Sequence, residues 1–119
     1  MIDENNISPI QSDFERIKKQ DENGSEYWTS RDLCNALGYS TYQKFNRILS
    51  KAIAIANRKG CNTTEHFNPT VEMVKLSSGS FRKVENIHLS RIACLMIAEN
   101  ADGKKPQVQM AGEYFKQEI

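Results

Sequence analysis

Five basic side chains in the middle of the chain have the type and spacing expected of an anion-binding surface. They lie between residues 33 and 64, a stretch that contains no aspartate or glutamate. The five are Lys44, Arg47, Lys51, Arg58 and Lys59. Solvated protein faces usually mix charges of both signs, whereas a block of one sign favours an anionic partner such as the phosphates of a nucleic acid.

The overall charge of the chain conceals this block. The formal net charge is only +1, because residues 1–32 hold eight acidic and four basic residues, while residues 65–119 hold seven of each. Lysines and arginines on a solvated helix face are common in their own right, and their aliphatic stems cover apolar surface. We favour anion binding over this alternative because no acidic residue interrupts the block.

A helix predicted from residue 41 to residue 59, and ended by Gly60, would bring four of these cations together. At about 100° per residue, they fall within a strip about 60° wide. We call this strip the basic stripe, and it consists of Lys44, Arg47, Lys51 and Arg58. The opposite side carries the residues predicted to join the core: Phe45, Ile48, Leu49, Ala52, Ile53 and Ala56. Tyr42 and Asn46 lie nearby and suit base or phosphate contact as well as they suit packing and solvent contact.

The segment from residue 30 to residue 52 is similar to the helix-turn-helix motif of DNA-binding proteins. Thr29 is predicted to cap a first helix, and Gly38 stands at the place of the glycine in the turn. Phe45 and Ile48, however, lie one residue later than the motif requires. We therefore favour a helix pair that only resembles the motif over a helix pair that binds DNA bases.

A β-hairpin is predicted where residues 71–76 and 81–89 flank the turn sequence SSGS. Arg82 and Lys83 follow this turn, so a wing at this position would place two cations against a DNA backbone. A plain exposed hairpin is the favoured alternative.

The segment from residue 89 to residue 100 is dense in apolar residues and predicts a helix that is buried nearly all round, with Ile92 and Met96 in the core. Arg91 lies in its first turn, where the helix dipole disfavours a cation. A charge at the rim of the core needs a partner. We expect a carboxylate, that of Glu72 or Glu113, and prefer this structural role to a phosphate contact. A further helix is predicted to begin near Pro106.

Several classes of site are not expected. The three cysteines form no Cys-x-x-Cys pair, and neither histidine stands at metal-ligand spacing from a cysteine, so neither a metal site nor a disulfide is predicted. No nucleophile–base–acid set and no glycine-rich phosphate loop is present, so we expect neither catalysis nor a cofactor. The sequence lacks a signal peptide and any apolar run of about 20 residues, which predicts no membrane contact and a cytoplasmic protein.

Several motifs, in the same order, resemble the DNA-damage-inducible protein D family. They are FERIK, NGSEYWTSRDLCNALGY, YQKF, LSRIACLMIAENADGKKP and EYF, and the resemblance covers about residues 13–115. That family in turn resembles the wider Bro-N class of phage antirepressors and viral Bro proteins. The resemblance implies a mixed α+β domain linked to DNA binding, transcriptional control or the DNA-damage response, without a catalytic site. The motif residues interpreted as structural are Trp28, Arg31, Gly38 and Arg91.

We therefore expect an α+β fold that is predominantly helical with a small β-hairpin. Residues 1–12 are predicted to be flexible and residues 13–119 to form a single domain. The family usually continues beyond the final Tyr-Phe pair, so the chain is a candidate N-terminal part of a longer protein. The predicted function is a regulatory module that contacts the phosphates of double- or single-stranded DNA. The alternative is a module that binds a repressor or another protein of DNA metabolism; the oligomeric state is left open.

Overall fold

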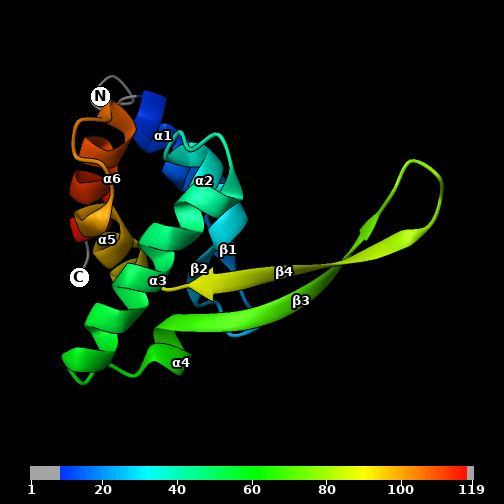
Figure 1. Ribbon diagram of the computed structural model, residues 1–119, viewed down its shortest axis with the longest axis horizontal. Coiled ribbons are helices and arrows are strands. Elements are labelled where there is room, and N and C mark those ends of the chain that lie inside the picture. The colour runs from blue at the N-terminus through cyan, green and yellow to red at the C-terminus, as the bar shows by residue number, and fades with distance from the viewer. Residues whose placement is uncertain (1–8, 118–119) are drawn as a thin grey trace.

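The computed structural model describes residues 9–117 and consists of helices packed beside a four-stranded antiparallel sheet (Figure 1). The helices are α1 (Pro9–Ile17), α2 (Ser30–Ala36), α3 (Tyr42–Arg58), α4 (Thr63–His66), α5 (Arg91–Asn100) and α6 (Pro106–Lys116). The strands are β1 (Lys19–Gln20), β2 (Glu26–Thr29), β3 (Phe67–Lys75) and β4 (Phe81–Leu89), in the order β1-β2-β4-β3. The predicted α+β class is confirmed, although the sheet is larger than the small hairpin that was expected.

Local signals set the ends of α2 and α3. The hydroxyl of Thr29 accepts a hydrogen bond from the backbone N–H of Asp32, and Thr41 caps α3 in the same way. Gly38 follows α2 with φ at +82°, and Gly60 follows α3 with φ at +78°. After each helix, backbone N–H groups return to carbonyls of the last turn, as in a Schellman motif. Both predicted helices therefore begin and end where their caps and glycines indicate.

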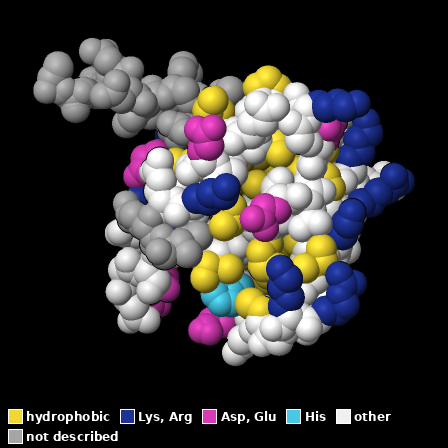
Figure 2. All heavy atoms as spheres, turned by 90° about the vertical axis from the view of Figure 1, so that its left-hand side faces the viewer, with side chains coloured by type: hydrophobic (Ala, Val, Ile, Leu, Met, Phe, Trp, Pro, Cys, Tyr) yellow, Lys and Arg dark blue, Asp and Glu magenta, His cyan; other side chains and the backbone are white. Residues whose placement is uncertain are grey.

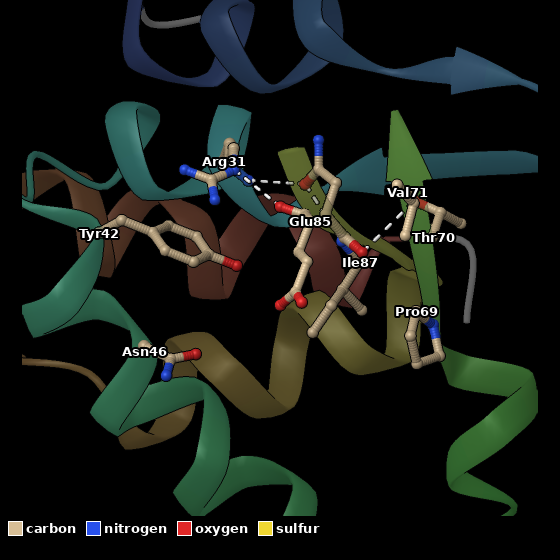
Figure 3. A pocket seen from close by; sticks show the side chains of 9 residues that line it. Arg31, Tyr42, Asn46, Pro69, Thr70, Val71, Glu85 and Ile87 are labelled. Atoms are coloured by element: carbon tan, nitrogen blue, oxygen red, sulfur yellow. Dashed lines mark hydrogen bonds between the residues drawn. The ribbon is translucent and has the colours of Figure 1, made fainter. Parts of the chain in front are cut away.

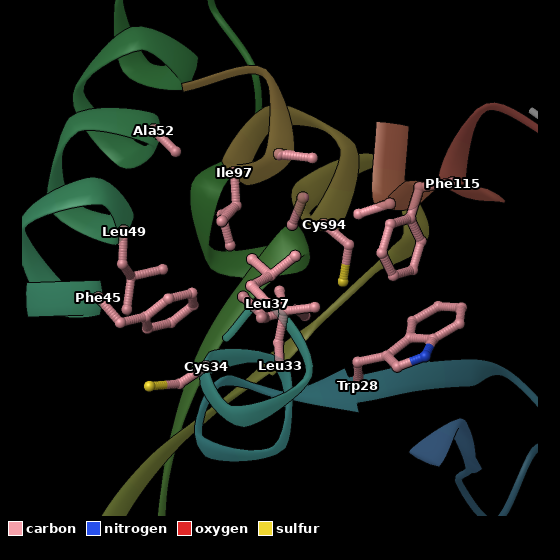
Figure 4. Close-up of a cluster of buried hydrophobic side chains, with 14 of the residues drawn as sticks. Trp28, Leu33, Cys34, Leu37, Phe45, Leu49, Ala52, Cys94, Ile97 and Phe115 are labelled. Atoms are coloured by element: carbon pink, nitrogen blue, oxygen red, sulfur yellow. The ribbon is translucent and has the colours of Figure 1, made fainter. Parts of the chain in front are cut away.

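The hydrophobic core lies between α2, α3, α5 and α6 and the end of β2. Figure 4 shows Phe45, Leu49 and Ala52 of α3 at one side, Trp28 and Phe115 at the other, and Leu33, Leu37 and Ile97 between them. Trp28 is fully buried, and its indole N–H donates to the carbonyl of Phe14 at 2.8 Å. Cys34 and Cys94 are also buried in this cluster as free thiols.

One sequence-based expectation is wrong at the level of a single element. Helix α5 is not buried all round, because Ile92 is 40% exposed and Met96 is only half-buried. When a helix is apolar all round, a helical-wheel projection does not show which side packs against the rest of the protein and which side faces solvent. Helix α1 begins at Pro9, so residues 9–12 of the segment predicted to be flexible are helical; residues 1–8 of that segment lie outside the described residues.

The β3–β4 hairpin projects from the body of the protein (Figure 1). Its strands pair along nine residues, from Phe67 opposite Leu89 to Lys75 opposite Phe81. Strand β2 pairs with β4 only at Trp28 and Thr29. Beyond that contact the hairpin is a two-stranded ribbon, and we call residues 71–85 the arm.

Candidate nucleic-acid interface

The basic stripe lies on the solvent side of α3. Its members, Lys44, Arg47, Lys51 and Arg58, are all exposed, as is Lys59 at the C-cap of the helix. None of these five forms an ion pair with a carboxylate within residues 9–117. The opposite side packs as predicted: Phe45, Leu49, Ala52 and Ala56 are buried, and Ile48 and Ile53 are partly buried. In Figure 2, Lys and Arg side chains gather along the right-hand edge of the molecule.

The charge pattern at the N-terminal end of α3 is not one that stabilises a helix, whereas Arg58 in the last turn is favourably placed. Its first turn contains no acidic residue, although acidic side chains are the ones that the helix dipole favours there. Lys44 stands in that turn instead. A cation at this end is unfavourable for an isolated helix, and the arrangement becomes favourable when an anion binds beside Lys44.

A pocket of about 440 Å³ separates the N-terminal half of α3 from the base of the arm (Figure 3). Arg31, Tyr42 and Asn46 line one wall. The other wall comes from β3 and β4 and includes Pro69, Val71, Glu85 and Ile87. The Arg31 guanidinium lies over the Tyr42 ring at 4.2 Å, and its Nε donates to the Glu85 carbonyl at 2.8 Å. Arg31 therefore links α2, α3 and β4.

A buried polar cluster below this pocket fastens the base of the arm to α2. The Asn86 side-chain oxygen accepts from the Ser30 hydroxyl at 2.8 Å and from the backbone N–H of Arg31 at 3.2 Å. The Asn86 amide nitrogen donates to Glu72 at 3.4 Å. The Tyr42 hydroxyl and the Ser30 hydroxyl are 2.8 Å apart. Tyr42 thus has a structural position, and Asn46 is the more exposed of the two candidate contacts.

No pattern in the sequence indicated that Ser30, Asn86 and Glu85 belong to this site. Ser30 and Asn86 are 56 positions apart in the chain, and neither belongs to a pattern that indicates a partner. The tertiary fold alone brings them together.

Arg91 has the carboxylate partner that its position demands, but the predicted partners are wrong. Its Nε and Nη2 donate to the two carboxylate oxygens of Glu26 at 2.7 and 3.1 Å. Its Nη1 donates to the Tyr114 carbonyl at 3.0 Å, and its guanidinium carbon lies 5.2 Å from the centre of the Trp28 ring. Strand β2 places Glu26 here because Trp28 pairs with Leu89, two residues before Arg91.

The carboxylates of this region have depressed pKa values. The hydrogen bonds from Arg91 are the main reason that the pKa of Glu26 lies below its ordinary value of 4.5. Hydrogen bonds from Lys18 and from the Tyr114 hydroxyl lower the pKa of Glu15. A carboxyl group whose pKa is depressed by folding stabilises the fold above its unfolded-state pKa, and this contribution is lost as the pH falls through the folded-state value.

We therefore expect acid to destabilise the protein, in part through Glu26. The urea midpoint should fall as the pH is lowered from about 6 to about 3, and it should fall less steeply for Glu26→Gln, which cannot titrate at this position. Glu22→Gln, which alters an exposed residue of the turn before β2, is the matched control and should keep the wild-type slope. Equal pH dependence in the wild type and Glu26→Gln would contradict the assignment.

The predicted hairpin cations lie apart from the basic stripe. Arg82 and Lys83 are exposed on β4, and the far end of the hairpin points away from α3 (Figure 1). Over residues 9–117, no three His, Cys, Asp or Glu side chains form a group that could hold a metal ion. Among the helices of that same part, none is both long and apolar enough to cross a membrane.

Comparison with known proteins gives one informative similarity. DNA damage-inducible protein D of Escherichia coli (strain K12) is 37% identical to the chain over 102 residues. The alignment covers 86% of this chain and 37% of the relative, so the chain spans little more than a third of that protein. No protein-family model matches the chain, and no solved structure matches it.

Proposed function

We propose, from this similarity, that the chain belongs to the DNA damage-inducible protein D family and is a DNA-associated regulatory module of the DNA-damage response. The module acts by binding, without catalysis. Membership of the Bro-N class and a role in antirepression stay predictions.

The basic stripe is the observation that carries this proposal. Four exposed cations stand on one side of α3 and have no carboxylate partner within the described residues. From Lys44 to Arg58 the helix rises about 21 Å, a length that spans several phosphates of a DNA backbone. Because phosphate contact carries no base information, the stripe supports DNA binding through the backbone rather than recognition of a particular sequence.

Replacing three stripe residues tests the proposal. The triple variant Lys44→Gln/Arg47→Gln/Lys51→Gln should bind duplex DNA more weakly than the wild type. The slope of log K against log salt concentration should become shallower by about 2.7, since each lost phosphate contact removes about 0.9. Binding is measured across a salt series, and circular dichroism verifies that the variant is folded.

The matched control removes three exposed cations elsewhere. Arg16→Gln/Lys104→Gln/Lys116→Gln has the same net charge as the stripe variant, but its changes lie on α1, before α6 and on α6. Its salt slope should stay close to that of the wild type. A folded stripe variant with wild-type affinity and slope would exclude DNA binding by α3.

A protein-interaction module is the second candidate function, favoured by the surface of α5. Ile92 is 40% exposed, and Leu95 and Met96 of the same helix are only partly buried. Apolar side chains gather at the centre of the face that carries α5 and α6 (Figure 2). Exposed apolar patches of this kind mark protein-binding sites. This function would be favoured if the wild type binds a partner protein but not DNA, and if Ile92→Asp abolishes binding to that partner.

A further inference from the structure

The arm is the largest feature of the fold that the basic stripe does not explain. Residues 71–85 form a two-stranded ribbon whose outer edges have no neighbouring strand among the described residues, because β2 pairs with β4 only at Trp28 and Thr29. Its base is held by the buried side chain of Asn86, which is 6% exposed and bonded to Ser30 of α2. The ribbon therefore projects in a direction that the body of the protein determines.

The arm carries apolar side chains on both faces. Residues directly opposite each other in antiparallel strands share a face, and faces alternate along a strand. Val71, Met73 and Phe81 therefore lie on one face, with exposures of 64%, 58% and 60%. Val74, on the other face, is 43% exposed. A ribbon that is apolar on both faces fits a groove, whose two walls can contact both faces, better than a flat surface, which contacts only one.

The charge of the outer part of the arm indicates which kind of partner it binds. Lys75, Arg82 and Lys83 are exposed in the outer part of the arm, residues 73–83, which contains no acidic residue. The two glutamates of the arm, Glu72 and Glu85, lie at its base. A second copy of the chain would bring three like charges against three others at the tip, so pairing of two arms is disfavoured. A partner with an anionic groove fits both the charge and the shape of the arm.

We propose that the arm inserts into a groove of duplex DNA, with Lys75, Arg82 and Lys83 on the phosphates and Phe81 and Met73 against the base pairs. This inference rests on the proposed function and extends it, because it selects duplex over single-stranded DNA. The major groove admits a two-stranded β-ribbon, and ribbons and apolar wedges in the minor groove partly unstack base steps.

Removing the apolar contacts gives the sharpest test. Met73→Ser/Phe81→Ser should weaken duplex binding about tenfold, while the salt slope stays unchanged because apolar groups release no counterions. Ile92→Ser is the matched control, since it replaces an exposed apolar residue on α5, and it should leave duplex binding unaltered. Circular dichroism and thermal melting verify folding of each variant.

A fluorescent base distinguishes groove contact from weak electrostatic attraction. Wild-type protein should raise the fluorescence of 2-aminopurine within a duplex, because apolar side chains wedged between base steps partly unstack them, and the arm variant should not. If the arm variant binds duplex with the same affinity as the wild type and gives the same fluorescence, the arm inference is overturned and the proposed function still stands. Binding of the wild type to single-stranded DNA but not to duplex would overturn the arm inference alone, and absence of binding to either form would overturn both.

Analytical sedimentation tests the alternative that the arm binds a second copy of the chain. The wild type should be no more self-associated than the arm variant. A wild-type dimer that the arm substitutions dissociate, with DNA binding unchanged, would assign the arm to a second copy of the chain and overturn the DNA assignment.

Discussion

Arg91→Met is expected to lower the free energy of unfolding by about 3 kcal/mol, near the lower end for breaking a buried ion pair because Glu26 keeps partial access to water. The Arg91 side chain is 9% exposed and the Glu26 side chain 30% exposed. Methionine retains the apolar stem beside Trp28, so the loss reports the hydrogen bonds and the charge. Without the guanidinium, the Glu26 carboxylate loses both hydrogen bonds from Arg91, whereas the Tyr114 carbonyl still accepts one from the backbone N–H of Gln117. Urea denaturation monitored by circular dichroism gives the value.

A double-mutant cycle with Glu26→Gln separates the pair from its surroundings. The double variant Glu26→Gln/Arg91→Met should be more stable than the sum of the two single losses predicts, by about 0.5–3 kcal/mol, because it leaves no unpaired charge. Losses that add without a coupling energy would show that the contact between these two side chains contributes nothing to stability.

Ile97→Ala is expected to destabilise the protein by about 2–5 kcal/mol, the usual range for truncating a buried isoleucine. Ile97 is fully buried and packs among Leu37, Leu49 and Cys94 in the core (Figure 4). The alanine side chain would leave a cavity that α3 and α5 cannot close without moving apart from their other contacts.

Ile92→Ala is the matched control for this prediction, since it makes the same substitution on the same helix at a residue that is 40% exposed. Its expected loss is under about 1 kcal/mol, because surface substitutions change stability little. Thermal or urea unfolding of both variants compares them directly. Equal losses at the two positions would contradict the orientation of α5.

The helices that frame the site were predicted from the sequence because their signals are local. Thr29, Gly38, Thr41 and Gly60 act on backbone groups within a few residues of themselves. The composition of the basic stripe follows from the fixed rotation of about 100° per residue, so the sequence contains it as soon as the helix is recognised. The DNA contacts of these residues remain predictions.

Contacts between distant segments could not be predicted in the same way. Glu26 and Arg91 are 65 positions apart, and nothing in the sequence distinguishes Glu26 from Glu72 or Glu113 as the partner. The pairing of β2 with the end of β4 decides it. The exposure of Ile92 is decided likewise by which side of α5 faces α3 and α6.

By itself, the sequence determined the boundaries of α2 and α3, the basic stripe and the existence of a hairpin, because each depends on neighbouring residues and on the regular geometry of the backbone. Only the tertiary structure decided the partner of Arg91, the polar cluster of Ser30 and Asn86, and the projection of the arm. The arm shows the physical reason most directly. Residues 71–85 have the composition of any hairpin, and they become an exposed ribbon because β2 is too short to pair with more than the last residues of β4.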